Sequence, residues 1–184
     1  MSSSPCGGST VRDVLSTYAL ALEAALISVQ PSIIASIVAV LKDGRHRGST
    51  VWLAGNGGSA ANAAHCALHL QQAGLRVVDL GANVPLLTAY SNDCGYARCF
   101  VEQVSPREGD MVGVFSCSGQ SPNILELLGA EAVQHRCTRF GFLGCGGGKA
   151  AALCHFAVAL PETRYGLIED AHSALLHILQ GALV

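Results

Sequence analysis

Two short loops rich in glycine and serine have the composition of an anion-binding site. They read Gly55-Asn56-Gly57-Gly58-Ser59 and Ser116-Cys117-Ser118-Gly119-Gln120-Ser121, and each lies between an apolar run and a segment with helical spacing. Glycines let the backbone approach an anion closely, and the unpaired N–H groups at a helix start point toward it. Serine hydroxyls add donors, so these loops could bind a phosphate without a lysine.

Either loop alone could be a simple capped turn, because serine is common at the start of a helix. The first loop is neither G-x-G-x-x-G nor a Walker loop, since no Gly-Lys-Ser/Thr follows. Loops at the carboxyl ends of parallel strands share one crevice, however. Two such loops therefore predict a common site for a phosphorylated small molecule.

A second group of residues has the donor chemistry of a metal site. His65 and His69 are four residues apart, which places both on one helix face at a spacing that can chelate a divalent ion. As an isolated pair they would more often be one exposed and one core histidine. On the last expected helix, Glu169 and His172 share a face, and His177 lies about two turns beyond Glu169. We expect His172 at the surface.

The elements around these residues alternate between strand and helix. After a Thr10 N-cap we expect helices at 11–26 and 33–41, the latter ending near Gly44 before a polar turn at 44–48. The remaining expected elements are strands at 51–54, 75–78, 111–115, 139–143 and 155–160, helices at 59–73, 122–135 and 165–183, and two helical pieces in 84–104 around Asn92-Asp93. This order predicts an α/β fold, doubly wound, with a mainly parallel five-stranded sheet flanked by helices and an N-terminal helical hairpin.

Composition limits the possible partners. Half of the 184 residues are apolar and 13% are charged, so spare apolar surface predicts a homo-oligomer. The net charge of −2 gives no reason to expect nucleic acid or a membrane surface as partner. No apolar run reaches the roughly 18 residues of a spanning helix, and the N-terminus lacks the pattern of a signal peptide. Eight cysteines without a C-x-x-C pair predict reduced thiols in a cytoplasmic protein.

The two loops, in this order and at this separation, resemble those of the sugar isomerase (SIS) domain. Further segments are similar to phosphoheptose isomerases, which convert sedoheptulose 7-phosphate to a heptose 7-phosphate. They are Leu87-Thr88-Ala89, Asn92-Asp93-x-Gly95-Tyr96, Glu102-Gln103-Val104, Gly109-Asp110, Gly147-Gly148-Lys149 and Ile168-Glu169-Asp170-x-His172 with His177. The resemblance implies a single SIS domain over 11–184 after a flexible tail at 1–10, and a homotetramer with sites between subunits.

The resemblance also assigns roles within the first two loops. It implies that the sugar phosphate is bound by Asn56, Gly57, Gly58, Ser59, Ser116, Cys117, Ser118 and Ser121, with Asn92 and Asp93 near the sugar. Cys117 stands where the family usually has threonine, which removes one strong hydroxyl donor. Lys149 could neutralise phosphate or be a solvated surface lysine.

The same resemblance implies a zinc site at His65, His69, Glu169 and His177. The family's usual residues at these positions are His, Glu, Gln and His, so the carboxylate here has moved from the first helix to the last. Three imidazoles and one carboxylate suit Zn²⁺, and also Ni²⁺ or Fe²⁺. We expect an isomerisation through an enediol, with Glu169 as base and His177 as acid, or with His69 as base.

Two other functions fit the same resemblance. Some SIS domains bind sugar phosphates or a replication initiator without catalysis, and the histidines argue against that function. An epimerase could use the same enediol.

Overall fold

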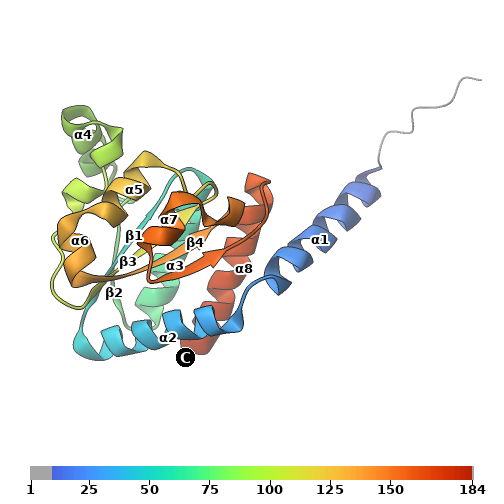
Figure 1. Cartoon of the computed structure of the whole chain (residues 1–184), viewed down its shortest axis with the longest axis horizontal. Coiled ribbons are helices and arrows are strands. Elements are labelled where there is room, and N and C mark those ends of the chain that lie inside the picture. Colours follow the sequence, from blue (N-terminus) through green and yellow to red (C-terminus); the bar gives the residue numbers. More distant parts are fainter. Residues whose placement is uncertain (1–9, 184) are drawn as a thin grey trace, which may run out of the picture.

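The computed structural model describes residues 10–183, and its centre is a sheet of five parallel strands (Figure 1). The strands are β1 (Thr50–Gly55), β2 (Arg76–Asp79), β3 (Asp110–Ser116), β4 (Cys137–Leu143) and β5 (Phe156–Ala159). Their order in the sheet is β2-β1-β3-β4-β5, and every neighbouring pair is parallel. Every residue of β3 is buried, as expected for a central strand covered on both faces.

Helices cover both faces of this sheet. They are α1 (Val11–Ile27), α2 (Pro31–Arg47), α3 (Gly58–Gln72), α4 (Val84–Cys94), α5 (Pro122–Gly129), α6 (Glu131–Arg136), α7 (Gly148–Leu153) and α8 (Tyr165–Leu183), with 3₁₀ turns η1 (Tyr96–Arg98), η2 (Val101–Gln103) and η3 (Cys145–Gly147). One apolar core joins α2, α3 and α8 to the sheet, and the other joins α5, α6 and α7. The doubly wound α/β architecture predicted from the sequence is confirmed.

The end of α2 differs from the prediction. The helix continues through the expected polar turn at 44–48 and ends at Gly48, whose φ of 69° is the left-handed conformation that stops a helix. Gly44 is buried inside the helix, where a Cβ would collide with the side chain of Met111. Gly44 therefore serves close packing of α2 on β3, and not chain reversal.

Two other helix boundaries also differ. The break expected at Asn92-Asp93 lies instead at Gly95, whose φ is 84°, so both residues belong to α4. The helix expected over 122–135 is divided at Ala130, which has an extended backbone with ψ of 133°. Neither break follows from apolar periodicity, because the spacing of apolar residues continues across it.

The first helix extends away from the body of the molecule (Figure 1). Thr10 and Asp13 form the capping box that starts α1, which confirms Thr10 as the N-cap, and the rest of the expected tail lies outside the described residues. The chain bends by 66° between α1 and α2, so the two helices do not form the expected hairpin. The Tyr18 hydroxyl donates to Asp170 on α8 at 2.6 Å. Among the described helices none is by itself long and apolar enough to span a bilayer. The bent pair α1–α2, taken together, has the length and apolar composition of a membrane span.

His172 is buried, and the surface position expected for it is wrong. Its side chain is 0% exposed and its ring lies 6.1 Å, centroid to centroid, from both Phe115 and Phe142. Burial of His172 could be predicted only by knowing which side of α8 faces the sheet, because the residue type alone favours exposure. Burial lowers the pKa of His172 from 6.5 to about 4.

We predict that this histidine makes the fold sensitive to acid. Between pH 6.5 and about 4 the unfolded chain binds a proton at His172 that the native chain does not. The free energy of unfolding therefore decreases as the pH is lowered through this window. This group contributes up to about 1.4 kcal/mol per pH unit. Urea denaturation at a series of pH values gives the free energy of unfolding as a function of pH. This free energy is expected to depend less steeply on pH for His172→Leu than for the native sequence. Equal slopes would contradict the prediction.

Candidate active site

The two Gly/Ser loops lie side by side at the carboxyl edge of the sheet. They follow β1 and β3, which are neighbours, and Gly55 is in register with Phe115. Together with the start of α8 they enclose a pocket of about 130 Å³. Its lining residues are Asn56, Ser59, Phe115, Ser116, Cys117, Ser118, Ser121, Tyr165 and Glu169. The structure thus brings together the loop side chains that the sequence assigned to one site.

The first loop presents the start of α3 to this pocket. Gly57 has φ of 56° and ψ of −125°, a conformation that other residues rarely adopt, and α3 begins immediately after it. A helix start carries unpaired N–H groups and a partial positive charge. The pocket therefore has the polarity that an anion requires.

The second loop is held by the Ser116 side chain and by the start of α7. The Gly119 N–H donates to Ser116 Oγ at 3.1 Å, and the Ala150 N–H donates to the Gly119 carbonyl at 3.0 Å. A Cβ on Gly119 would collide with the backbone of Gly147, so the loop sits directly on the glycine run before α7. Lys149 is exposed and does not line the pocket.

Glu169 brings a carboxylate to the pocket, beside the Cys117 thiol. The Cys117 thiol donates to Glu169 Oε1 at 3.6 Å, and its sulfur lies 3.6 Å from Ser59 Oγ. Burial raises the pKa of Cys117 to about 11, with the Glu169 charge adding to the effect. The group is therefore a neutral thiol at physiological pH and acts as a donor. A Cβ on Gly58 would overlap the carboxylate, which lies against the start of α3.

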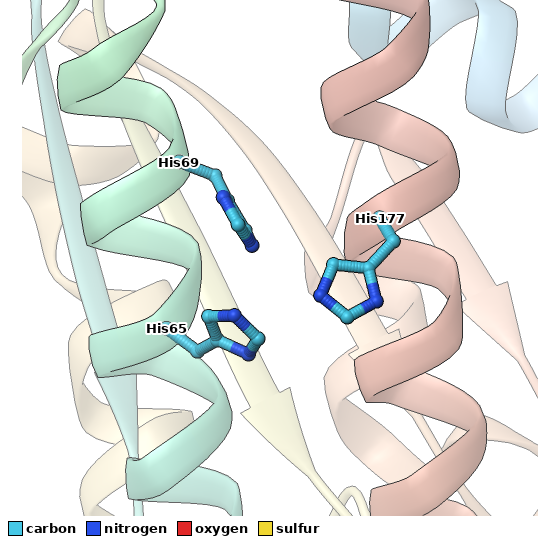
Figure 2. A group of neighbouring side chains, drawn as sticks. All are labelled: His65, His69 and His177. Atoms are coloured by element: carbon cyan, nitrogen blue, oxygen red, sulfur yellow. The ribbon is translucent and has the colours of Figure 1, made fainter.

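The three histidines come together between α3 and α8. Figure 2 shows His65 and His69 on one helix facing His177 on the other. Their ring centroids are 4.4, 5.0 and 5.2 Å apart, and one nitrogen of each lies within 4.8 Å of the others. Burial lowers the pKa of His65, with smaller contributions from His69 and His177, so its imidazole is neutral at physiological pH.

The environment of His69 fits a bound metal ion. Within residues 10–183, both of its ring nitrogens are buried and have no hydrogen-bond partner. Such unsatisfied polar atoms are uncommon in folded proteins, and a metal ion shared with His65 and His177 would give His69 a partner. Neutral imidazole nitrogens at this spacing are ligands for Zn²⁺, Ni²⁺ or Fe²⁺. The cluster could therefore hold a divalent metal ion.

The structure separates the residues expected to act together at the metal. The nitrogens of His65, His69 and His177 form one group, whereas the carboxylate of Glu169 lies in the pocket between the two Gly/Ser loops, beside Cys117. Glu169 precedes His177 by eight residues, which is about 12 Å along a helix. Its role as a fourth ligand stays a prediction.

Two expected sugar contacts lie elsewhere, and one residue of the pocket was missed. Asn92 and Asp93 are exposed on α4, hydrogen-bonded to one another at 2.9 Å, and do not line the pocket. Tyr165 does line it, and its carbonyl accepts from the Cys117 thiol at 3.9 Å. Tyr165 lies four residues before Glu169, so the helical period could have placed both on one face.

Comparison with known proteins gives consistent matches. Residues 17–136 match the SIS domain family. The chain is 36% identical over 156 residues to the phosphoheptose isomerase of Rhodospirillum rubrum, covering 80% of this chain and 82% of the relative. It is 37% identical over 170 residues to that of Burkholderia pseudomallei strain 1710b, covering 88% and 83%. The structure of phosphoheptose isomerase from Neisseria gonorrhoeae superposes with a TM-score of 0.87 at 26% identity, covering 95% of this chain and 98% of that one.

We predict that metal-free protein is stabilised by Zn²⁺ through the histidine cluster. At a free ion concentration about 100 times Kd, the expected stabilisation is about 2.7 kcal/mol, visible as a higher Tm. His69→Ala should remove most of this shift, whereas His46→Ala, an exposed histidine on α2, should keep it. An equal Zn²⁺-dependent rise in Tm for His69→Ala would show that the cluster is not the site.

Proposed function

The chain belongs to the phosphoheptose isomerase family of SIS domains, and from this we propose that it interconverts a ketose phosphate and an aldose phosphate. The proposed pair is sedoheptulose 7-phosphate and a heptose 7-phosphate, which follows from the activity of the named relatives. The observation that carries the proposal is that α3 and α8 join a phosphate pocket to a cluster of three histidines. A protein that only bound sugar phosphates would need the pocket alone.

In this proposal the loops bind the phosphate. The hydroxyls of Ser59, Ser118 and Ser121 line the pocket together with the start of α3. Backbone N–H groups and hydroxyls can hold an anion without a basic side chain. The neutral Cys117 thiol lies beside them and donates its one proton to Glu169.

Glu169 is the proposed base. An aldose–ketose isomerase removes a proton from C1 of the ketose, forms an enediol, and returns the proton to C2, while a hydroxyl proton moves from O1 to O2. Among the described residues that line the pocket, Glu169 has the one carboxylate. A carboxylate can take the carbon-bound proton and return it to the neighbouring carbon, which is the transfer that isomerisation requires.

The histidines are the proposed metal ligands. His65, His69 and His177 would hold a divalent ion, most simply Zn²⁺, which supplies polarisation of the substrate carbonyl when it is bound. A nitrogen that binds a metal has no lone pair left for a proton, so His69 is a poor base. For the same reason His177 acts either as ligand or as general acid. Loss of metal from His177→Ala would identify it as a ligand.

We further propose that the chain works as a homo-oligomer, a tetramer by its family membership. Several large apolar side chains of α1 are exposed, among them Val11 at 78% and Leu15 at 66%. The helix extends from the body, so a second copy can cover this surface (Figure 1). The cytoplasmic location expected from the cysteines stays a prediction.

The role of Glu169 is tested by Glu169→Gln with sedoheptulose 7-phosphate in deuterated water. The native protein is expected to produce a heptose phosphate with deuterium at C2. The variant should lose about 10²- to 10⁴-fold in kcat, the usual contribution of a general base, with unchanged metal content and no loss of phosphate affinity.

Other outcomes separate the competing roles. Full turnover by Glu169→Gln would eliminate Glu169 as the base, and loss of metal would make it a fourth ligand. Exchange that yields a second ketose or an inverted aldose would indicate an epimerase. If the native protein binds the substrate but gives neither product nor exchange, the isomerase proposal fails.

The oligomer is tested by a charge on α1. Leu15→Asp is expected to lower the mass measured by light scattering, because an exposed apolar contact becomes charged. Ser16→Asp, one position along the same exposed turn, is the matched control and should keep the native mass. An unchanged mass for Leu15→Asp would remove this surface from the interface.

A further inference from the structure

A buried asparagine outside the pocket makes a closed pair of hydrogen bonds with the first phosphate loop. Asn56 Nδ2 donates to Asn123 Oδ1, and Asn123 Nδ2 donates to Asn56 Oδ1, both at 2.9 Å. Asn123 lies in the first turn of α5 and is 1% exposed. Its second N–H faces Cys99 Sγ at 3.7 Å. Every polar group of the Asn123 amide therefore has a partner.

This side chain is not needed to start its helix. Ser121 is the N-cap of α5, and no side chain caps the first turn. A buried amide is costly unless its hydrogen bonds are made, so an apolar residue would serve packing alone at less cost. The contact with Asn56 is thus the specific use of the Asn123 amide.

A third residue fixes which way the Asn56 amide faces. The two ends of an amide differ, since the oxygen accepts and the nitrogen donates. The Tyr96 hydroxyl donates to Asn56 Oδ1 at 2.8 Å, so this oxygen accepts from both Tyr96 and Asn123. Tyr96 does not line the pocket, whereas Asn56 does. The carbonyl end of Asn56 is therefore turned toward Tyr96, and the second N–H at the other end remains to donate.

We infer that Asn123 is a positioning residue for anion binding, which holds Asn56 so that its N–H and not its carbonyl oxygen is offered to the phosphate. A carbonyl oxygen in that place would repel the phosphate oxygens, and a freely turning amide would offer the wrong end part of the time. The inference rests on the proposed function in one respect, that the pocket between the two loops receives the phosphate.

The test compares Asn123→Ala, Asn56→Ala and the double variant. Inorganic phosphate binding is measured by calorimetry, and KM and kcat are measured with sedoheptulose 7-phosphate. Asn123→Ala is expected to weaken phosphate binding about tenfold, the range of one charge-assisted hydrogen bond, and to raise KM similarly. The kcat should stay within about twofold, because the Asn123 amide contacts Asn56 and Cys99 and neither Glu169 nor the three histidines.

The double variant separates positioning from a structural role. If Asn123 acts through Asn56, then Asn123→Ala should change phosphate affinity by less than about twofold once Asn56 is alanine. A structural role would instead give independent losses that multiply, together with a lower kcat. Glu126→Gln, on the outer side of the same helix, is the matched control and should leave phosphate affinity unchanged.

Tyr96→Phe keeps the test decisive if Asn123→Ala does not fold. Tyr96 is 55% exposed, so loss of its hydroxyl should not affect folding, and phosphate affinity should fall about threefold. Native affinity in Tyr96→Phe or in folded Asn123→Ala would overturn the inference and leave the isomerase proposal standing. If the native protein binds phosphate but does not turn over the substrate, the isomerase proposal is overturned and the inference about Asn123 stands. If the native protein binds no phosphate, both are overturned.

Discussion

The packing of α3 against α8 is the interaction on which the candidate site depends. Helix α3 starts at the first Gly/Ser loop and carries His65 and His69, while α8 carries Glu169 and His177. The Asn62 side chain donates to the Glu169 carbonyl at 3.0 Å and ties the two helices together next to the pocket. A small rotation of either helix would separate the histidines and move the carboxylate. The geometry of the pocket and that of the histidine cluster therefore depend on the same helix packing.

The Glu169 carboxylate lies at the pocket between the two Gly/Ser loops. A glutamate beside an anion pocket is unfavourable unless its charge is compensated. Here the start of α3 and the Cys117 thiol both face it, and Gly58 leaves room for it. Glu169 and Cys117 are therefore neighbours in space, although 52 residues separate them in sequence.

Much of the fold could be predicted because it depends on local patterns. Short apolar runs predicted all five strands, and the glycines and serines after two of these runs marked both loops. Parallel strands place such loops at one edge of the sheet. Features that depend on distant contacts were missed. His172 is buried because it faces Phe115 and Phe142, and Asn123 matters because of Asn56, 67 residues away. The helix was expected to end near Gly44, but this glycine is there to make room for Met111, which lies on β3.

The protonation of Cys117 has a consequence for chemical stability. With a pKa of about 11, the thiolate fraction at pH 7 is on the order of one in ten thousand. Peroxide and alkylating reagents attack the thiolate and not the thiol, so a cysteine in this place is slow to be damaged. The pocket thus holds a sulfur atom that oxidants attack slowly, which leaves the site little dependent on the redox state of its surroundings.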